Sequence, residues 1–333
     1  MANPILVELT RGDLVESVHR GSVAVLDASG AVRLALGDVM SPVYSRSSLK
    51  PMQAMVLVES GAAEAFGLSD EEVALACASH SGEPMHTGRV TAWLARLGLG
   101  EHDLACGAHP SRYEPVAEAM IRDGLKPTRV FNNCSGKHAG FLTVARHWDF
   151  AAEHYERAEH PVQRAVAAVL RDLSDAADLP YGIDGCAAPN FATSLAEFAR
   201  AAARMAAPDA LEKPRADAAR RIIGAMIKYP ELMSGTGRAC ATLIRAGGGR
   251  VAVKTGAEGF FGGWIPGLGL GIAIKIDDGA GRAAETAIAA VLDRLGLLGE
   301  AAQGILRAPI LNTRGTVVGE RRPAAALMAM EIS

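Results

Sequence analysis

Alternating hydrophobic and polar residues mark both ends of the chain as β structure. Near the N-terminus, strand patterns cover residues 5–9, 14–18, 21–26 and 32–36, with turn residues at 11–13 and 28–30. Strand patterns return at 251–254 and, after a glycine-rich turn, at 268–275, and residues 310–319 read as a further hairpin. These patterns predict an antiparallel sheet that closes only when strands from the two termini meet.

The middle of the chain has a helical pattern from residue 49 to about 297. Helices are predicted at 161–174, 191–206, 212–228 and 280–296, and Asp70 opens another. We therefore expect an α/β fold of the α+β type, with the antiparallel sheet flanked by helices. The expected division is one domain, 1–333, with a sheet-containing lobe at about 1–60 and 240–333 and a mainly helical lobe at about 61–239.

Composition restricts the function classes. The chain has 333 residues, of which 49% are hydrophobic and 21% charged, and its net charge of -3 comes without a basic block. Nucleic acid and membranes are therefore not expected as partners. No signal-peptide pattern opens the chain, and the most apolar stretch, 260–274, is interrupted by glycines and Pro266, so we expect a cytoplasmic protein. Five cysteines, an odd number, favour reduced thiols.

Two short motifs suggest the chemistry. Ser47 precedes Lys50 by one helical turn, and a strand pattern ends in Lys254-Thr255-Gly256. A serine and a lysine at this spacing lie on one helix face. A lysine that is buried beside a second cation loses its proton more readily and becomes a base for the serine. The alternative is an ordinary helix start, where the serine caps the helix and the lysine is solvated.

Longer strings extend these motifs at residues 46–53, 78–83, 132–140, 182–186 and 254–259. Together they resemble the L-asparaginase II family of the rhizobial type (class 3 L-asparaginases), within an architecture like that of serine β-lactamases, penicillin-binding proteins and serine-type glutaminases. The strings occur in the family's order, and the resemblance covers nearly the whole chain.

The resemblance implies hydrolysis of L-asparagine to L-aspartate and ammonia by two Ser-Lys pairs. Ser47 pairs with Lys50, and Ser79 pairs with Lys254. Ser47 is the expected nucleophile and Lys50 its general base, while Ser79 and Lys254 relay protons toward the leaving nitrogen. Spacing does not decide which serine is acylated, so Ser79 remains the second choice. Without the resemblance, Ser79 reads as a helix-end cap.

The resemblance also implies a zinc site formed by Cys134, Lys137 and Cys186, with water as the fourth ligand. A lysine binds zinc only when neutral, so the site would be unusual. From spacing alone, these residues read as two buried thiols and a lysine. The expected role of the zinc is to position substrate or to join two loops, because Ser-Lys chemistry needs no metal.

Substrate recognition calls for charges opposite to those of an amino acid. Asp184, on a glycine-bracketed loop, is the candidate for the α-ammonium, and Arg46 is the candidate for the α-carboxylate. An Asx turn and a surface salt bridge are their structural alternatives. Further candidate donors are Gly136, Lys137 and His138. The glycines of residues 229–238 predict a tight loop over the pocket, with an ordinary helix-to-strand connection as the alternative.

Three other functions remain open at this stage. A glutaminase or a broader amidase of the same fold needs only a longer pocket. A non-catalytic relative that binds an amino acid or zinc would keep Asp184 and the cysteines, although both Ser-Lys pairs are complete here. The family further implies a homodimer.

Overall fold

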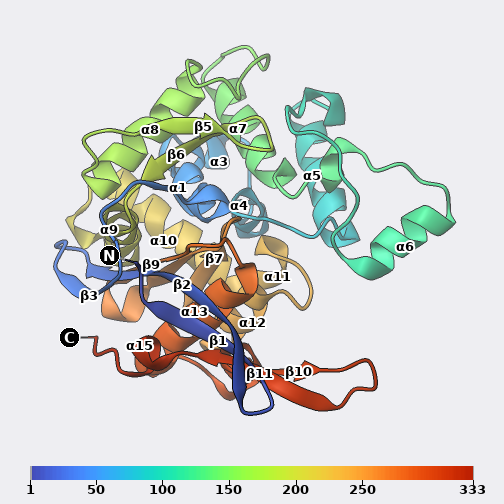
Figure 1. The fold of residues 1–333 in the computed structure, drawn as a ribbon. Coiled ribbons are helices and arrows are strands. Elements are labelled where there is room, and N and C mark those ends of the chain that lie inside the picture. The colour runs from blue at the N-terminus through green and yellow to red at the C-terminus, as the bar shows by residue number, and fades with distance from the viewer. Residues whose placement is uncertain (1, 333) are drawn as a thin grey trace. The chain divides into compact units, whose positions relative to one another are not determined.

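The chain folds into two compact units in a computed structural model that describes residues 2–332 (Figure 1). The sheet unit comprises Met1–Ser48, Ala192–Ala207 and Thr242–Ser333, and the helical unit comprises Leu49–Phe191 and Pro208–Ala241. Residues 192–207 thus belong to the sheet unit, although they come from the middle of the stretch predicted as the helical lobe.

The sheet unit is built on antiparallel strands from both ends of the chain. Their order is β10-β11-β1-β2-β9-β8-β7, and β3 also pairs with β2. Val7 of β1 lies opposite Pro323 of β11, so the prediction that the termini meet in one sheet is confirmed. The strands are β1 (Ile5–Arg11), β2 (Leu14–Asp27), β3 (Val32–Leu36), β7 (Ala252–Thr255), β8 (Phe260–Ile265), β9 (Leu270–Ile276), β10 (Ala308–Leu311) and β11 (Val317–Pro323).

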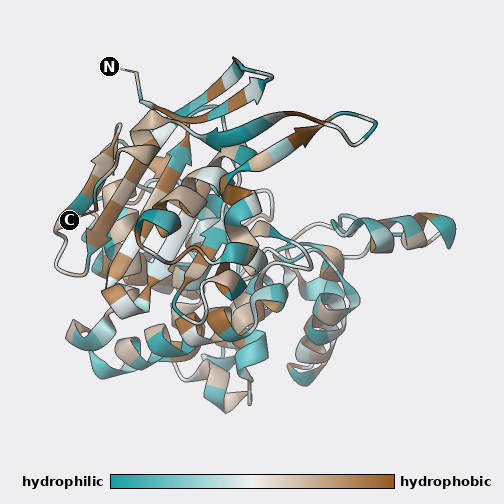
Figure 2. Ribbon diagram, turned by 90° about the horizontal axis from the view of Figure 1, so that it is seen from below, coloured by the Kyte–Doolittle hydropathy of each residue, from teal (hydrophilic) through white to brown (hydrophobic). Residues whose placement is uncertain are grey.

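Two strand predictions were wrong in detail. The patterns at 14–18 and 21–26 form the single strand β2, because its first half pairs with β1 and its second half with β9. Residues 260–265, expected in a glycine-rich turn, form β8, and all of them are buried. Gly262 is needed there because a Cβ atom would lie 2.7 Å from the ring of Phe198. Figure 2 shows hydrophobic residues along strands of this sheet.

Helices pack against the sheet inside this unit. Helix α9 (Leu195–Ala206) contacts β2, β8 and β9, and α13 (Gly281–Arg294) contacts β1, β8, β9 and β11. The predicted helix at 191–206 begins only at 195, where Ser194 and Glu197 form a capping box. The remaining helices of this part of the chain are α14 (Gln303–Leu306) and α15 (Ala325–Met328), and α12 (Ala239–Ala246) begins where the helical unit ends.

The helical unit is arranged around α7 (Ser135–His147), whose residues from 135 to 145 are all buried. A helix that is buried on every side must be surrounded, and α7 contacts α2, α3, α4, α5 and α8. The other helices of this unit are α1 (Lys50–Gln53), α2 (Met55–Glu59), α3 (Ala62–Ala65), α4 (Asp70–Ala76), α5 (Pro84–Arg96), α6 (Glu114–Arg122), α8 (Pro161–Ser174), α10 (Lys213–Lys228) and α11 (Pro230–Met233). The predictions for α8 and α10 are confirmed.

Three short strands form a second antiparallel sheet in the order β4-β6-β5. They are β4 (Val43–Tyr44), β5 (Tyr181–Ile183) and β6 (Pro189–Thr193). The loop between β5 and β6 carries Asp184 and Cys186.

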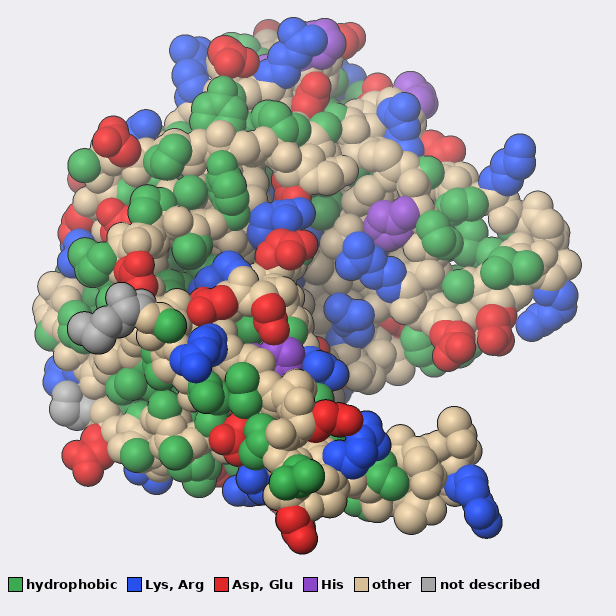
Figure 3. Space-filling view, viewed as in Figure 1, with side chains coloured by type: hydrophobic (Ala, Val, Ile, Leu, Met, Phe, Trp, Pro, Cys, Tyr) green, Lys and Arg blue, Asp and Glu red, His purple; other side chains and the backbone are tan. Residues whose placement is uncertain are grey.

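Side chains of both charges are interspersed over the face seen in Figure 3. Among residues 2–332, no helix combines the length and the apolar character needed to cross a membrane.

Candidate active site

In the sheet unit, the segment that carries Ser47 is attached to the end of β7. The Ser48 hydroxyl donates a hydrogen bond to the carbonyl of Lys254 at 2.6 Å. Gly256 lies so close to this segment that a Cβ atom there would be 2.4 Å from the carbonyl oxygen of Ser45. Only glycine allows this approach. The two motifs that were separated by about two hundred residues are therefore neighbours.

Ser47 follows a residue with an unusual backbone conformation. Arg46 begins the short helix η1 (Arg46–Leu49) with a φ angle of 50°, in the left-handed region. The backbone of a residue other than glycine is strained in this region, and such strained residues are common at functional sites. Ser47 itself is partly exposed.

Both lysines of the predicted pairs are completely buried. Lys254 is 0% exposed, and its Nζ donates to the carbonyl of Thr255 at 2.9 Å. Lys50 is 1% exposed. The alternative interpretation of Lys50 as the solvated lysine of an ordinary helix start is therefore wrong.

Lys50 is held by three acceptors in the helical unit. Its Nζ donates to the Ala78 carbonyl at 2.6 Å, the Asn133 carbonyl at 3.3 Å and the Ser79 Oγ at 3.0 Å. An ammonium group has three donors and no acceptor, so this arrangement satisfies the charged form. Lys50 must lose one of these protons before it can act as a base.

Ser79 lies in the loop that follows α4. The helix ends with Cys77 as its C-cap, so the alternative interpretation of Ser79 as a helix-end cap is wrong. Its backbone N–H donates to the carbonyl of Met233 at 3.1 Å, and the residue is 8% exposed. The loop is therefore fixed from both sides, by Lys50 and by the end of α11.

The contact between Lys50 and Ser79 is one that the sequence motifs did not predict. Each predicted pair joins residues of different units, because Ser47 and Lys254 belong to the sheet unit and Lys50 and Ser79 to the helical unit. Both predicted pairings stay predictions.

Two neutral histidines support the Ser79 loop. His80 Nδ1 accepts from the N–H of Gly82, so its Nε2 carries the proton and donates to Ser135 Oγ at 2.9 Å. The ring of His86 stacks on it at 4.8 Å. Burial is the main cause that lowers the pKa of His80 well below its usual value.

A buried carboxylate joins the same loop to residues 234–238. Glu83, 5% exposed, accepts from the Thr236 N–H at 2.9 Å and from its Oγ1 at 2.6 Å. Gly235 has a φ of 127°, and a Cβ atom there would lie 2.2 Å from the Ser81 hydroxyl. The tight loop predicted at 229–238 is confirmed only for residues 234–238, because residues 230–233 form α11, and whether the loop covers a pocket stays a prediction. The sequence analysis did not predict the contact between Glu83 and Thr236, although the two residues lie in the segments 78–83 and 229–238 that it named.

The residues predicted to bind zinc lie together in the helical unit. Lys137 Nζ is 3.0 Å from Cys186 Sγ, and Cys134 shares a hydrogen bond with Cys186. That bond, assisted by the charge of Lys137, lowers the pKa of Cys186 to about 4, whereas the same bond and burial raise the pKa of Cys134 to about 12. Burial opposes the charge of Lys137, but the two sulfurs raise its pKa above the usual value. The cluster is an ammonium–thiolate pair beside a neutral thiol.

This donor set fits zinc in part. Two adjacent sulfurs are natural zinc ligands, whereas Lys137 would have to release its proton before binding. Among residues 2–332, no group of three or more His, Cys, Asp and Glu side chains is placed to hold a metal ion. Any zinc would therefore depend on Lys137 or on water for its remaining ligands.

Asp184 lies on a tight hairpin beside this cluster. Its carboxylate accepts from the Gly185 N–H at 2.8 Å, and its own N–H donates to the Ala188 carbonyl at 3.0 Å. The turn-stabilising alternative is thus seen in the structure. The Asp184 charge also helps to raise the pKa of Lys137, so the carboxylate acts on the cluster as well.

The two remaining candidates on α7 have clear packing roles. A Cβ atom on Gly136 would lie 2.3 Å from the Leu75 carbonyl, so glycine lets α7 approach α4. His138 Nδ1 lies 2.7 Å from the hydroxyl of Tyr155, and burial lowers the pKa of His138 to about 3. Their predicted contacts with substrate stay predictions.

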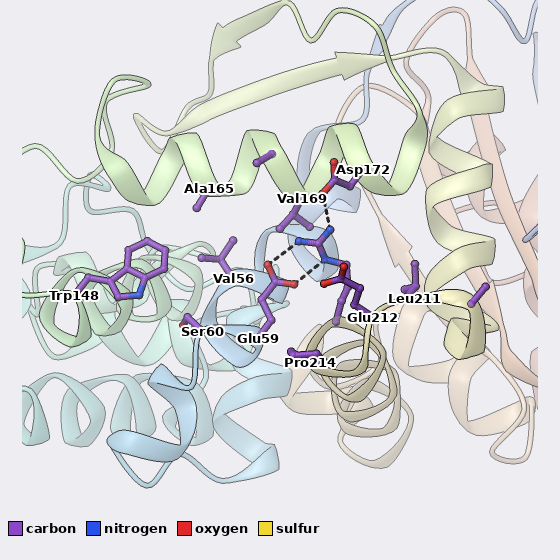
Figure 4. A pocket seen from close by; sticks show the side chains of 13 residues that line it. Val56, Glu59, Ser60, Trp148, Ala165, Val169, Asp172, Leu211, Glu212 and Pro214 are labelled. Carbon is purple, nitrogen blue, oxygen red and sulfur yellow. Dashed lines mark hydrogen bonds and ion pairs between the residues drawn. The ribbon is translucent and has the colours of Figure 1, made fainter.

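A groove of about 620 Å³ in the helical unit lies apart from all these residues (Figure 4). Arg215 there is paired with Glu59 and Asp172. None of the candidate site residues lines it, so it is not part of the candidate active site.

Comparison with known families gives this site its context. The model of the L-asparaginase II family matches residues 7–323. This match places the protein in the amidohydrolase class of enzymes. The chain belongs to the L-asparaginase II family.

Solved structures offer only distant similarity. A β-lactamase from Mycobacterium bovis is 15% identical, with a TM-score of 0.42, and the match covers 86% of this chain and 93% of that one. A structure of Mglu in its tris and glutamate form is 16% identical, with a TM-score of 0.41, covering 89% of this chain and 64% of that one. The comparison with curated proteins found no match.

Proposed function

We propose that the protein hydrolyses L-asparagine to L-aspartate and ammonia by serine nucleophilic catalysis. The observation that supports this most directly is the pair of buried lysines, Lys50 and Lys254, attached to segments that carry Ser47 and Ser79. Membership of the L-asparaginase II family supports a small amide as substrate. The protein acts in the cytoplasm as a homodimer under the same proposal.

In the proposed reaction, a serine oxygen forms a bond to the side-chain amide carbon of asparagine. The C–N bond then breaks, and the nitrogen leaves as ammonia after it receives a proton. Water hydrolyses the resulting ester and releases aspartate. Ser47 is the proposed nucleophile with Lys50 as its base, and Ser79 with Lys254 supplies the proton to nitrogen.

The contact between Lys50 and Ser79 adds a consequence to this scheme. A proton that Lys50 takes from the nucleophile has a hydrogen-bonded route to Ser79 Oγ, 3.0 Å away. The proposed base of the first step is thus already hydrogen-bonded to the serine that is proposed to help protonate the leaving nitrogen. The same contact keeps Ser79 as the second candidate nucleophile.

Zinc, where bound, would be held by Cys134, Cys186 and a neutral Lys137, and would act as a Lewis acid or a structural tie. We expect metal analysis of protein purified without chelator to find about one zinc per chain, because these three residues provide ligands for a single ion. Cys186→Ser should lose it, while Cys240→Ser, a buried cysteine outside the cluster, should keep it. Absence of zinc from the folded wild type would contradict this proposal.

The deciding experiment measures ammonia release from L-asparagine and L-glutamine by the wild type, Ser47→Ala and Ser79→Ala. We expect asparagine to be the better substrate, and both variants to lose activity. Trapping of an acyl-enzyme in Ser79→Ala but not in Ser47→Ala would assign the nucleophile. Preference for glutamine would make the protein a glutaminase, and a folded wild type without turnover would leave only a binding role.

A further inference from the structure

A pocket of about 460 Å³ lies in the sheet unit, and none of the candidate site residues lines it. Residues of β1, β2, β10 and β11 line this pocket, together with Arg282 in the first turn of α13. The helix itself packs on this part of the sheet, where it contacts β1 and β11. A pocket of this volume can hold a small molecule.

The pairing of three strands places two basic side chains on the same face of the sheet. Arg321 of β11 lies opposite Leu9 of β1, and Leu9 lies opposite Ser17 of β2. His19 follows two residues after Ser17. Residues that lie opposite each other, or two positions apart along a strand, share a face of the sheet. His19 and Arg321 therefore lie on one face, two strands or about 10 Å apart across the sheet.

Arg282 is anchored to this face by His19, which is 5% exposed. The Arg282 Nε donates to the His19 Nε2 at 3.2 Å, so the His19 Nδ1 carries the proton and donates to Asp278 Oδ2 at 2.6 Å. Asp278 thus acts on Arg282 through the imidazole and forms no ion pair with it. The chain of contacts fixes one edge of the guanidinium group. Its two Nη groups have no hydrogen-bond or ion-pair partner within residues 2–332.

Arg321 is the second basic residue of the pocket lining. Across the described residues 2–332, its side chain makes no hydrogen bond or ion pair, and its Nε is buried. Burial lowers the pKa of Arg321, while the charge of Glu285 opposes this change and that of Arg282 adds to it. The donors of this guanidinium can therefore be satisfied by an acceptor that comes from outside the chain.

We propose that this pocket binds the phosphate group of a small molecule, with Arg282 and Arg321 as its ligands. A guanidinium group binds phosphate through parallel hydrogen bonds, and one phosphate group has enough oxygens to serve two guanidinium groups at once. Its charge of about −1.5 to −2 also matches two arginines, whereas a carboxylate carries one charge and two oxygens. The site lies apart from the proposed hydrolysis of asparagine, so the inference does not depend on the proposed function.

The other groups around the pocket agree with an anionic ligand that has an organic part. Arg11 and Glu16 also line the pocket, but they pair with each other at 2.9 Å, so their charges offset each other. Glu285 acts on Arg321 from α13 and forms no ion pair with it. The lining from β10, residues 308–310, is Ala-Pro-Ile. These apolar side chains suit the organic part of a phosphate monoester.

Titration calorimetry of the full chain tests this site with inorganic phosphate, phenyl phosphate and succinate at constant ionic strength in chloride. We expect the wild type to bind both phosphates saturably, phenyl phosphate more tightly, and succinate more weakly than either. Arg282→Met and Arg321→Met should each weaken the binding of phosphate roughly 10- to 100-fold, as expected for lost hydrogen bonds to a charged group. Arg314→Ala, an exposed arginine in the turn between β10 and β11, is the matched control and should bind as the wild type does.

Denaturant unfolding without phosphate separates a binding role of Arg321 from a structural one. Arg321→Met should unfold at the same denaturant concentration as the wild type or at a higher one, because it removes a buried donor that has no partner in the chain. A structural role predicts a lower midpoint for this variant, and that result would overturn the assignment of Arg321 as a ligand.

The binding outcomes are equally distinct. No saturable binding of phosphate by the folded wild type, or wild-type affinity in Arg321→Met, overturns the proposed site. Succinate that binds as tightly as phosphate overturns the choice of phosphate as the ligand. Turnover of L-asparagine plays no part in these measurements, so failure of the phosphate site leaves the proposed function intact.

Discussion

At the scale of single residues, the candidate site depends on charges that the fold has removed from water. Lys50 and Lys254 are both completely buried, and each is held by carbonyl oxygens of its own unit. A buried ammonium that only served packing would be costly compared with methionine or leucine. The chemistry proposed for these lysines is the reason to keep two amines at positions where methionine or leucine would be less costly.

Replacing Lys50 tests whether its buried amine takes part in the reaction. We expect Lys50→Met to retain the fold, because Met matches the length of the side chain, and to lose activity about 1000-fold, the size of a general-base contribution. Asparagine turnover and circular dichroism are the measurements. Lys228→Met, on the exposed side of α10, should behave as wild type. Normal turnover by Lys50→Met would exclude Lys50 as the base.

His80 gives a prediction for the dependence of stability on pH. Its pKa is lowered in the native state, mainly by burial, so below pH about 6.5 the unfolded chain binds a proton that the native chain does not. The free energy of unfolding should therefore fall as the pH is lowered, by up to about 1.4 kcal/mol per pH unit for this group.

Denaturant unfolding between pH 7 and 5 measures this slope. His80→Gln should reduce the slope of the free energy of unfolding against pH by the contribution of about one proton. The side chain of His102 is 84% exposed, so His102→Gln should not change this slope. Equal slopes in wild type and His80→Gln would show that His80 does not contribute.

At the scale of elements, glycines decide how closely helices approach their neighbours. On β9, a Cβ atom at Gly271 would lie 2.0 Å from the Ala199 carbonyl of α9. The two nearest atoms are backbone atoms of Ala199 and Ala203, which cannot move like a flexible side chain, so α9 can pack this closely on the sheet only while this position stays glycine.

We expect Gly271→Ala to lower the free energy of unfolding by about 1–3 kcal/mol, the usual cost of overpacking. Gly224→Ala is the matched control, because Gly224 lies inside α10 with open space around its Cα. It should raise stability by about 0.5–1 kcal/mol through helix propensity. Chemical denaturation compares the two, and equal effects would contradict the packing argument.

At the scale of the whole molecule, the sheet is completed by residues from opposite ends of the sequence. Leu9 of β1 lies opposite Arg321 of β11, and the Ala324 N–H donates to the Leu6 carbonyl at 2.8 Å. The sheet unit therefore cannot be complete until the last strand has been synthesised.

Deleting residues 308–333 should test this dependence. Without β10, β11 and α15, the edge of β1 is open, and we expect loss of cooperative unfolding and aggregation. Deleting only residues 331–333 should leave the thermal midpoint close to that of the full chain, because residues 331 and 332 belong to no strand or helix. A stable, monodisperse protein after the longer deletion would contradict this account.

The sequence by itself determined what depends on neighbours along the chain. Sequence patterns placed α8, α10 and the terminal strands, and the strings around Ser47, Ser79, Cys134, Asp184 and Lys254 indicated the family that the comparison then confirmed.

Tertiary structure alone decided what depends on residues distant in the chain. The contact between Lys50 and Ser79 joins residues 29 positions apart, and that between Glu83 and Thr236 joins residues 153 apart. The glycines of β8 read as a turn in the sequence, whereas in the structure β8 pairs within the sheet and α9 and α13 pack against it. Local patterns report which face of an element is apolar, but the partner that covers that face, and the buried donor or acceptor it brings, is set only by packing.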